Sequence, residues 1–408
     1  MANQFNTEVM IAEKMLQFLS GSSTVLKYVN RKYEADFLAH KGRMGQTLQI
    51  EKPPRFATVD GPVLTGVQDV VIPLTNVTIN KWKTVAVKLT GKERTFTANN
   101  FDLMAEKYVK PVADAIIKDV TNDIFGLASQ VANFMGTPGT GFGTTAPAGM
   151  TNLLNGKAKL DYFNTPENDR VLFLDPMSAA KLGAQLSTNF NPTGDVSKTI
   201  KTGAIPPIGG FNIFQAPNVY SQTVGNYAGT PVINGANQQG NSIVTNGWTA
   251  SKSLAAGDVI QFAGVYSVNP STKSSTGLLQ DFVVTAATTA DGSGNMTIPV
   301  YPSIITSGAF QNVTASPANS ASVSVKTGTA NSSYHQNFGW WKDALGLVSV
   351  PVDNLTEFGL PGVTKNFDGL SVTVSKGGDF MQYEGYWRVD FVYGVCVHYN
   401  EQAIRFTD

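Results

Sequence analysis

Side chains that commonly carry out chemistry are few in this 408-residue chain, and they lie far apart. The three histidines, His40, His335 and His398, have no ligand partner at the spacing of a metal site. His398 and Glu401 are three residues apart at the expected end of a strand, so their side chains would point to opposite faces. The single cysteine, Cys396, lies in an apolar run with no nearby cation to favour its thiolate. These residues predict neither a metal centre nor a cysteine nucleophile.

Sequence motifs for catalysis are equally weak. The glycine-rich stretch 136–149 follows an expected helix instead of a strand and contains no Gly-Lys-Ser/Thr, so it predicts a connector and not a phosphate-binding loop. Neither Gly-x-Ser-x-Gly nor His-Glu-x-x-His occurs. Nothing singles out one carboxylate pair among the 30 acidic residues. We therefore expect no enzyme, no cofactor and no bound metal.

The composition limits the partners. The chain has 30 Lys and Arg against 30 Asp and Glu, so it lacks the net basic field of a dedicated DNA reader or a binder of anionic membranes. The N-terminal apolar stretch is interrupted by Glu13 and Lys14 and has no basic leader, which predicts neither a signal peptide nor a membrane anchor. A single cysteine excludes an internal disulfide framework and fits a reducing compartment. The pattern is typical of a soluble protein made in the cytoplasm.

Two helices are predicted from apolar spacing in the first third of the chain. Residues 7–19 form a short amphipathic helix. Residues 97–134 carry apolar side chains at steps of three or four and form one long helix, with Thr97 as N-cap and a kink at Pro111. A helix of such length favours an elongated or flat domain.

A long loop is expected between these helices. It contains Pro53-Pro54, which neither a helix nor a central strand accepts. Alternation resumes at 67–74 and 77–89, and these two strands are expected to pair back along the loop. Long ordered loops in compact domains usually have a function.

An α/β layer is predicted next. Residues 170–175 read as a buried strand, Asp175-Pro176 opens a helix, and 211–217 is another strand. The aromatic strands of 333–408 are expected to return to this same layer.

An uncharged β unit interrupts that layer. Residues 221–332 hold only Lys252, Asp258, Lys273, Asp281, Asp291 and Lys326 as charged residues. The segment 257–285 has two alternating runs around an Asn-Pro-Ser-Thr-Lys turn, which predicts a β-hairpin. Strand-like runs at 231–234, 241–250, 278–286, 295–302, 309–315 and 321–325 complete six or seven short strands, as in a small barrel or sandwich. We expect a domain inserted at one surface site of its host domain, with both of its ends close together.

This order of elements resembles the major capsid (coat) proteins of tailed double-stranded DNA phages, in particular the podoviral coat group. The stretches that carry the resemblance are "YVNRKYEADF" with "KGRMGQTLQIEKPPRF", "GDVIQFAGVYSVNP", and "WWKDALGLVSVPV" with "YWRVDFVYGVCVHYNEQAIRF". The resemblance implies an α+β, Hong Kong-type capsid fold with an inserted telokin-like all-β barrel. One departure is that the first part of the insert, up to Ser251, is free of charge, which puts salt bridging by its loops in doubt.

The resemblance also implies a division of the chain and a set of partners. The parts are an N-arm (1–44), an extended loop region (45–90), a peripheral domain with the spine helix (91–149), an axial domain (150–220 and 333–408) and the inserted barrel (221–332). The implied function is a non-catalytic major capsid protein that self-assembles through pentamers and hexamers into an icosahedral shell. The implied partners are many copies of itself, a scaffolding protein, a portal protein and double-stranded DNA held non-specifically, with no membrane. Assembly is expected in the bacterial host cytoplasm and the final location in the virion capsid.

Glu51, Lys52 and Arg55 at the outer part of the loop are the candidates for contacts between subunits. Alternatively, these are solvated loop charges, each of which contributes well under ~1 kcal/mol to stability.

Two alternative functions also remain open at this point. One is a carbohydrate-binding or hydrolysing protein with Trp248 in an exposed aromatic platform, and the other is a β-rich phage tail or adhesin component.

Overall fold

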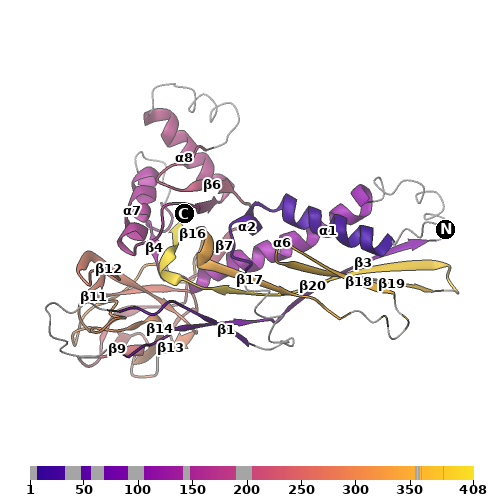
Figure 1. Cartoon of the computed structure of the whole chain (residues 1–408). Helices are drawn as coiled ribbons and strands as arrows, with labels where there is room; N and C mark the ends of the chain where they lie inside the picture. Colours follow the sequence, from indigo (N-terminus) through magenta and orange to yellow (C-terminus); the bar gives the residue numbers. More distant parts are fainter. Residues whose placement is uncertain are drawn as a thin grey trace, which may run out of the picture. The chain divides into compact units, whose positions relative to one another are not determined.

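The computed structural model describes residues 7–32, 47–56, 69–90, 105–140, 148–189, 205–353, 356, 359, 361–379 and 381–408. The chain divides into two compact units, each built from three separate segments. Unit 1 comprises Met1–Glu51, Leu74–Ile124 and Leu345–His398, and unit 2 comprises Lys52–Pro73, Phe125–Ala344 and Tyr399–Asp408. Helices and sheets occur together in the chain, which confirms the expected α+β class (Figure 1).

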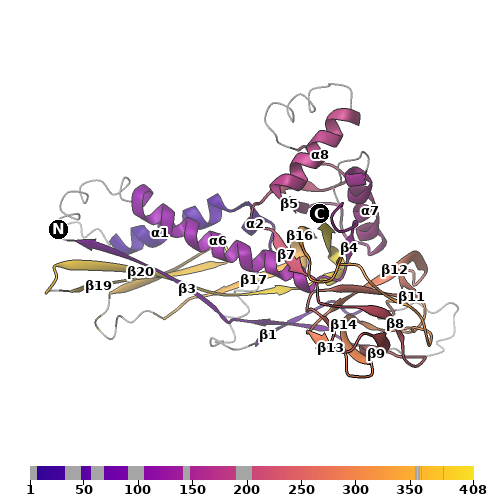
Figure 2. The ribbon, with the colours of Figure 1, turned by 180° about the vertical axis from the view of Figure 1, so that it is seen from behind.

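An antiparallel sheet forms the centre of unit 1. Its strands are β17 (Leu345–Val350), β20 (Glu384–Val397), β19 (Leu370–Asp379) and β18 (Gly362–Phe367) in that order, and β3 (Lys81–Thr90) also pairs with β20. Helix α1 (Thr7–Ser22) packs on β18 and β19 and is followed by the short α2 (Thr24–Lys27). The buried residues of α1 are Ile11, Ala12, Met15, Leu16 and Leu19, which confirms the first predicted helix. Helix α6 (Lys110–Gly126) lies on the same side of the sheet as α1 (Figures 1 and 2).

The pairing of β20 corrects the expectation that all of 333–408 joins the layer of 150–220. Strand β20 pairs with β3 from Glu384 opposite Thr90 to Tyr393 opposite Lys81. Its other edge is occupied by β19 over 373–379. Both edges of this long strand are therefore satisfied by strands of unit 1. The aromatic alternation was identified correctly, but periodicity within one strand carries no information about which strand pairs with it.

The long predicted helix is shorter at its C-terminal end than expected. It runs as the π-helical segment η1 (Ala105–Val109), then α6, then the 3₁₀ turn η2 (Leu127–Gln130). Thr97 lies outside the described residues. The chain becomes extended at Val131, where the side chain of Asn400 accepts a hydrogen bond from Ala132 N (3.0 Å) and donates one to Gln130 O (2.6 Å). This distant asparagine replaces the next helical hydrogen bonds, so the helix ends although the apolar spacing continues.

Strand pairing in the loop region is partly as predicted. Strand β2 (Leu74–Thr78) pairs antiparallel with β1 (Thr47–Glu51), so the chain does return along itself. The second predicted strand instead becomes β3 and pairs with β20. The apolar residues 70–72 lie in neither a helix nor a strand.

Unit 2 contains a mixed sheet that we call the carrier sheet. Its order is β4 (Phe134–Met135), β21 (Ala403–Thr407), β16 (Ser333–Trp341), β5 (Arg170–Leu174) and β6 (Asn212–Gln215), with β7 (Tyr220–Thr223) also paired to β16. Strands β5 and β6 and helix α8 (Pro176–Asn189) confirm the predicted strand, helix and strand. Asp175 caps α8, since its carboxylate accepts a hydrogen bond from Met177 N at 2.9 Å. Helix α7 (Ala148–Tyr162) was not predicted.

The inserted β unit is a closed barrel. Its sheet order is β15 (Val323–Val325), β11 (Val259–Val268), β12 (Ser275–Val284), β14 (Met296–Ile304), β9 (Gly240–Trp248) and β8 (Gly229–Ile233). The outer strands meet, because Ile233 N donates to Ala321 O and Ser320 N donates to Ile233 O, both at 2.9 Å. The predicted hairpin is the β11–β12 pair, with Val259 opposite Val283. The run 309–315 forms no strand and contributes only a bridge between Val313 and Ser267.

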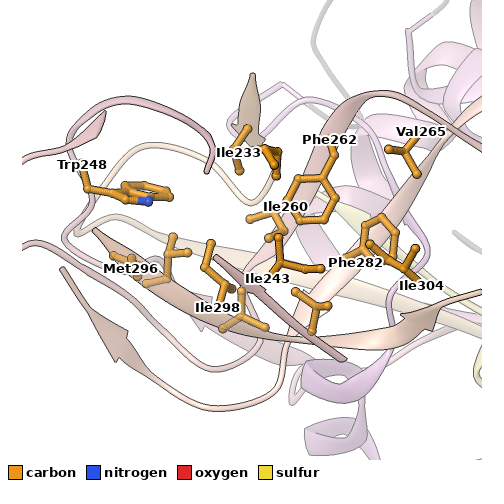
Figure 3. Packing of buried hydrophobic residues seen from close by; sticks show 14 of the residues in the cluster. Ile233, Ile243, Trp248, Ile260, Phe262, Val265, Phe282, Met296, Ile298 and Ile304 are labelled. Carbon is orange, nitrogen blue, oxygen red and sulfur yellow. The ribbon is translucent and has the colours of Figure 1, made fainter. Parts of the chain in front are cut away.

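The barrel interior is filled by a cluster of buried hydrophobic side chains (Figure 3). Ile260 and Phe262 of β11 face Phe282 and Val284 of β12 within it, and the rings of Phe262 and Phe282 are 5.1 Å apart. An irregular register between Gln261 and Tyr266 shifts the alternation of β11, so its interior positions follow no simple period of two.

We expect Phe262→Ala to destabilise the barrel by about 3–5 kcal/mol, because it removes a fully buried ring and leaves a cavity. Tyr266→Ala on the same strand is the matched control, since Tyr266 is 40% exposed. It should cost less than about 1 kcal/mol. Urea unfolding followed by circular dichroism measures both, and equal losses would contradict the assigned interior.

A carboxylate in unit 1 makes stability depend on pH. Asp390 accepts hydrogen bonds from Trp82 Nε1 (2.8 Å), Thr84 Oγ1 (2.6 Å) and Arg388 Nε (2.8 Å). Burial by itself raises the pKa of Asp390, but the hydrogen bonds from Arg388, Thr84 and Trp82 outweigh it and leave the pKa below its ordinary value. Its ionised form therefore stabilises the folded state.

We expect this stabilisation to be complete above the unfolded pKa of about 3.9 and to disappear as the pH falls through the lower folded pKa. Asp390→Asn should unfold at lower urea than the unsubstituted chain at neutral pH, with the difference shrinking below about pH 4. Asp119→Asn, which removes a half-exposed partner of Lys83, is the control. A difference that stays constant with pH would rule out this role for Asp390.

Candidate inter-subunit interface

The three candidate contact residues follow one another at the base of the long loop, but the structure uses them differently. Glu51 is the last residue of β1, opposite Leu74, and its side chain is exposed. Lys52 continues the ribbon, since its N–H donates to Pro73 O at 2.8 Å. Its ammonium lies 5.3 Å from the centre of the Tyr399 ring, within the range of a cation–π contact.

Arg55 forms an ion pair within the chain. Its Nη2 donates to Glu401 Oε1 at 2.8 Å, with the side chains 39% and 28% exposed. Burial raises the pKa of the Tyr399 phenol, Glu401 raises it further, and Arg55 opposes the rise. Burial lowers the pKa of Lys273, and Arg55 lowers it further. Arg55 is therefore paired within its own chain although its side chain is partly exposed, and Lys52 and Arg55 both bind the loop base to residues 399–401.

A set of exposed apolar side chains lies in the same loop region. Its members are Phe56, Val70, Val71, Ile72 and Leu74, and Phe56 and Val70 are more than 60% exposed. We call this set the apolar loop stretch. Large apolar side chains exposed together commonly mark an interaction surface. The run "DVVIPL" is the available sequence signal, but the alternation over 67–74 predicts a strand there.

Metal-binding side chains do not cluster among the described residues. Within these ranges, no group of three or more His, Cys, Asp or Glu side chains could hold a metal ion. Cys396 is buried among apolar residues of unit 1. Ser178 and Lys181 in α8 have the Ser-x-x-Lys spacing of a serine nucleophile with a nearby lysine. However, Lys181 pairs with Asp408 (2.7 Å), and buried Ser178 Oγ accepts a hydrogen bond from Asn337.

The structure removes the basis for a glycan platform at Trp248. This side chain is only 4% exposed and belongs to the barrel interior (Figure 3). Its Nε1 donates to Thr245 Oγ1 at 2.8 Å. None of the helices in the described ranges combines the length and apolar character needed to cross a bilayer.

Comparison with known proteins gives a family for the whole chain. Residues 1–406 match the family model described as "P22 coat protein - gene protein 5". No curated protein sequence matches. Among solved structures, a chain of Mycobacterium phage Che8 is similar over 93% of this chain and 89% of that chain, at 13% identity and a TM-score of 0.46. The capsid of Ralstonia phage GP4 is similar over 89% and 82%, at 7% identity and a TM-score of 0.43.

A shorter similarity falls on part of the chain. The CUS-3 coat protein I-domain matches 26% of this chain and 97% of its own length, at 28% identity and a TM-score of 0.17.

The family model spans residues 1–406 and therefore decides the identity of the chain. The chain belongs to the P22 coat protein family and is a structural major capsid protein of a tailed phage, with the phage capsid fold.

Proposed function

We propose that copies of this chain assemble through pentamers and hexamers into a closed icosahedral shell around double-stranded DNA. The family match over residues 1–406 carries this proposal. A balance of 30 basic and 30 acidic residues supports it, because near-neutral subunits repel one another little and do not grip packaged DNA strongly. Scaffolding and portal proteins are the further partners we propose, with assembly in the cytoplasm of the bacterial host and no catalytic step.

The proposed contact between subunits is the loop region 45–90. The apolar loop stretch offers exposed area that a neighbouring copy would remove from water, at roughly 25 cal/mol per Å². Many such contacts repeated around a shell add through multivalency, so each can be weak. Glu51 is proposed to face a neighbour, while Lys52 and Arg55 orient the loop base through Tyr399 and Glu401.

We also propose that the assembled subunit has five parts. They are an N-arm (1–44), an extended loop region (45–90), a peripheral domain (91–149), an axial domain (150–220 and 333–408) and an inserted barrel (221–332). The axial part is revised to exclude 345–397, whose strands pair within unit 1.

The double substitution Val70→Ser/Ile72→Ser should suppress shell formation, because it removes exposed apolar area from the proposed contact. Subunit stability should change by less than about 0.5 kcal/mol, since both side chains are exposed. Negative-stain microscopy of the chain co-expressed with a scaffolding protein measures assembly. Val244→Ser on the barrel, where the side chain is 39% exposed, is the control and should assemble normally. Normal shells from the double variant would remove the apolar loop stretch from the interface.

The charged candidates can be separated by a second pair of variants. Glu51→Lys should slow assembly, most strongly at low salt, with unchanged urea unfolding of the subunit, because its charge would face a neighbour. Arg55→Ala should lower subunit stability by less than about 1 kcal/mol, since the pair with Glu401 is partly exposed. Light scattering during assembly and urea unfolding distinguish the two effects. A salt-independent assembly rate for Glu51→Lys would contradict its proposed position.

A further inference from the structure

The few charges of the barrel segment are not all on its surface. Residues 221–332 contain six charged residues, and two of them, Asp258 and Asp281, are 0% and 1% exposed. Burying a carboxylate is costly unless it is paired and hydrogen-bonded. In a segment with so few charges, two buried carboxylates indicate that these positions need charge.

Asp281 lies on β12, on the opposite side of the strand from Phe282, which faces the barrel interior. Its Oδ2 contacts the ammonium of Lys159 on α7 and accepts a hydrogen bond from Phe134 N of β4 at 2.9 Å. Its Oδ1 accepts a hydrogen bond from Gln261 Nε2 at 2.6 Å. The carboxylate therefore binds the barrel to two elements outside it, a helix and a strand of the carrier sheet.

A second buried cation and anion complete the charge balance at this end of the barrel. Arg405 of β21 donates from Nη1 to Gly257 O at 3.0 Å. Asp258, the next residue, accepts hydrogen bonds from Gly225 N (3.0 Å) and Ala255 N (2.8 Å). Burial lowers the pKa of Arg405 to about 10, while Tyr220, Asp258 and Asp281 oppose that decrease. Of the four buried charges in this region, Lys159 and Asp281 form the ion pair, while Arg405 and Asp258 are held by hydrogen bonds to uncharged groups.

We infer that the Lys159–Asp281 ion pair is the positioning pair that holds the barrel in one orientation on helix α7 and the carrier sheet. The chain enters the barrel after β7 and leaves it before β16, and these two strands pair with each other. Hydrogen bonds to carbonyl oxygens supplement this two-stranded connection, among them those from Arg405 Nη1 to Gly257 O and from Asn269 Nδ2 to Tyr162 O (2.8 Å) at the end of α7. An apolar contact tolerates sliding, whereas the Asp281 carboxylate must meet donors at fixed points on α7 and β4. Neither Lys159 nor Asp281 belongs to the barrel interior, so loss of the pair should loosen the attachment and leave the barrel folded.

Hydrogen exchange of the full-length subunit, followed by mass spectrometry, tests this inference. In Lys159→Met, peptides from α7, β4 and β12 should exchange about tenfold faster or more, because Asp281 is left as a buried unpaired charge. Peptides from β9 and β14 in the barrel should exchange as in the unsubstituted protein. The control is Lys157→Met on the same helix, where the side chain is 30% exposed and pairs with Asp161 and Glu167. It should change neither set of peptides.

A second variant covers the case in which Lys159→Met does not fold. Lys159→Met/Asp281→Leu leaves no unpaired charge and should fold, as apolar replacements of buried ion pairs commonly do. Its barrel peptides should stay protected, while α7, β4 and β12 exchange faster than in the unsubstituted protein, because Phe134 N–H and the Gln261 amide lose their acceptor. Full protection of these three elements in the double variant would overturn the inference. Equal loosening of β9 and β14 in either variant would overturn it too, since the pair would then stabilise the barrel itself.

Discussion

An inserted domain must leave and rejoin its carrier at one place, and in unit 2 this constraint is met by two hydrogen-bonded strands. β7 and β16 pair from Ser333 opposite Thr223 to Gln336 opposite Tyr220, so entry and exit are adjacent. The carboxylate of Asp258, at the start of β11, accepts hydrogen bonds from Gln222 and Gly225 on the entering segment and from Thr327 on the leaving segment. One buried acidic residue thus ties together both crossings of the chain and the first residues of the barrel hairpin. The carrier sheet remains continuous because the insertion removes no strand from it.

The carrier sheet places aromatic rings and a buried cation side by side. Phe173 and Trp340 stack with ring centres 5.1 Å apart, and the ring of Phe338 lies 4.9 Å from that of Trp340. On the neighbouring strand β21, Arg405 is paired opposite Phe338 and contacts the ring of Phe134. Its Nη1 donates to Gly257 O of the barrel segment. The ring face and the carbonyl oxygen supply partners that a buried cation needs.

A capsid subunit also needs surfaces that bind weakly and repeatedly. The chain has a formal charge of zero and leaves the large apolar side chains of the apolar loop stretch exposed. The base of this region is held within the subunit by Lys52 and Arg55, through Tyr399 and Glu401. Ordering the base before association reduces the conformational entropy that a loop would otherwise lose on binding. Of the three charges first considered for contacts between subunits, Lys52 and Arg55 are therefore suited to order the loop base, and the proposed contact falls to Glu51 and the apolar loop stretch.

The sequence by itself determined those features that depend on neighbouring residues. Apolar spacing placed α1, short strand-like runs placed β5, β6 and most of the barrel, alternation placed the β11–β12 hairpin, and Asp175-Pro176 marked the start of α8. Periodicity and capping act over a few residues, so the sequence contains them. Family resemblance, carried by the order of these elements, added the function. Only the tertiary structure decided that the long helix ends at Gln130, since Asn400 lies 270 residues away along the chain. It also decided that β20 pairs with β3, that Arg55 pairs with Glu401, and that Asp281 is buried against Lys159. These outcomes depend on which distant segments meet, and no local pattern of side chains specifies the partner of a strand edge or of a charge.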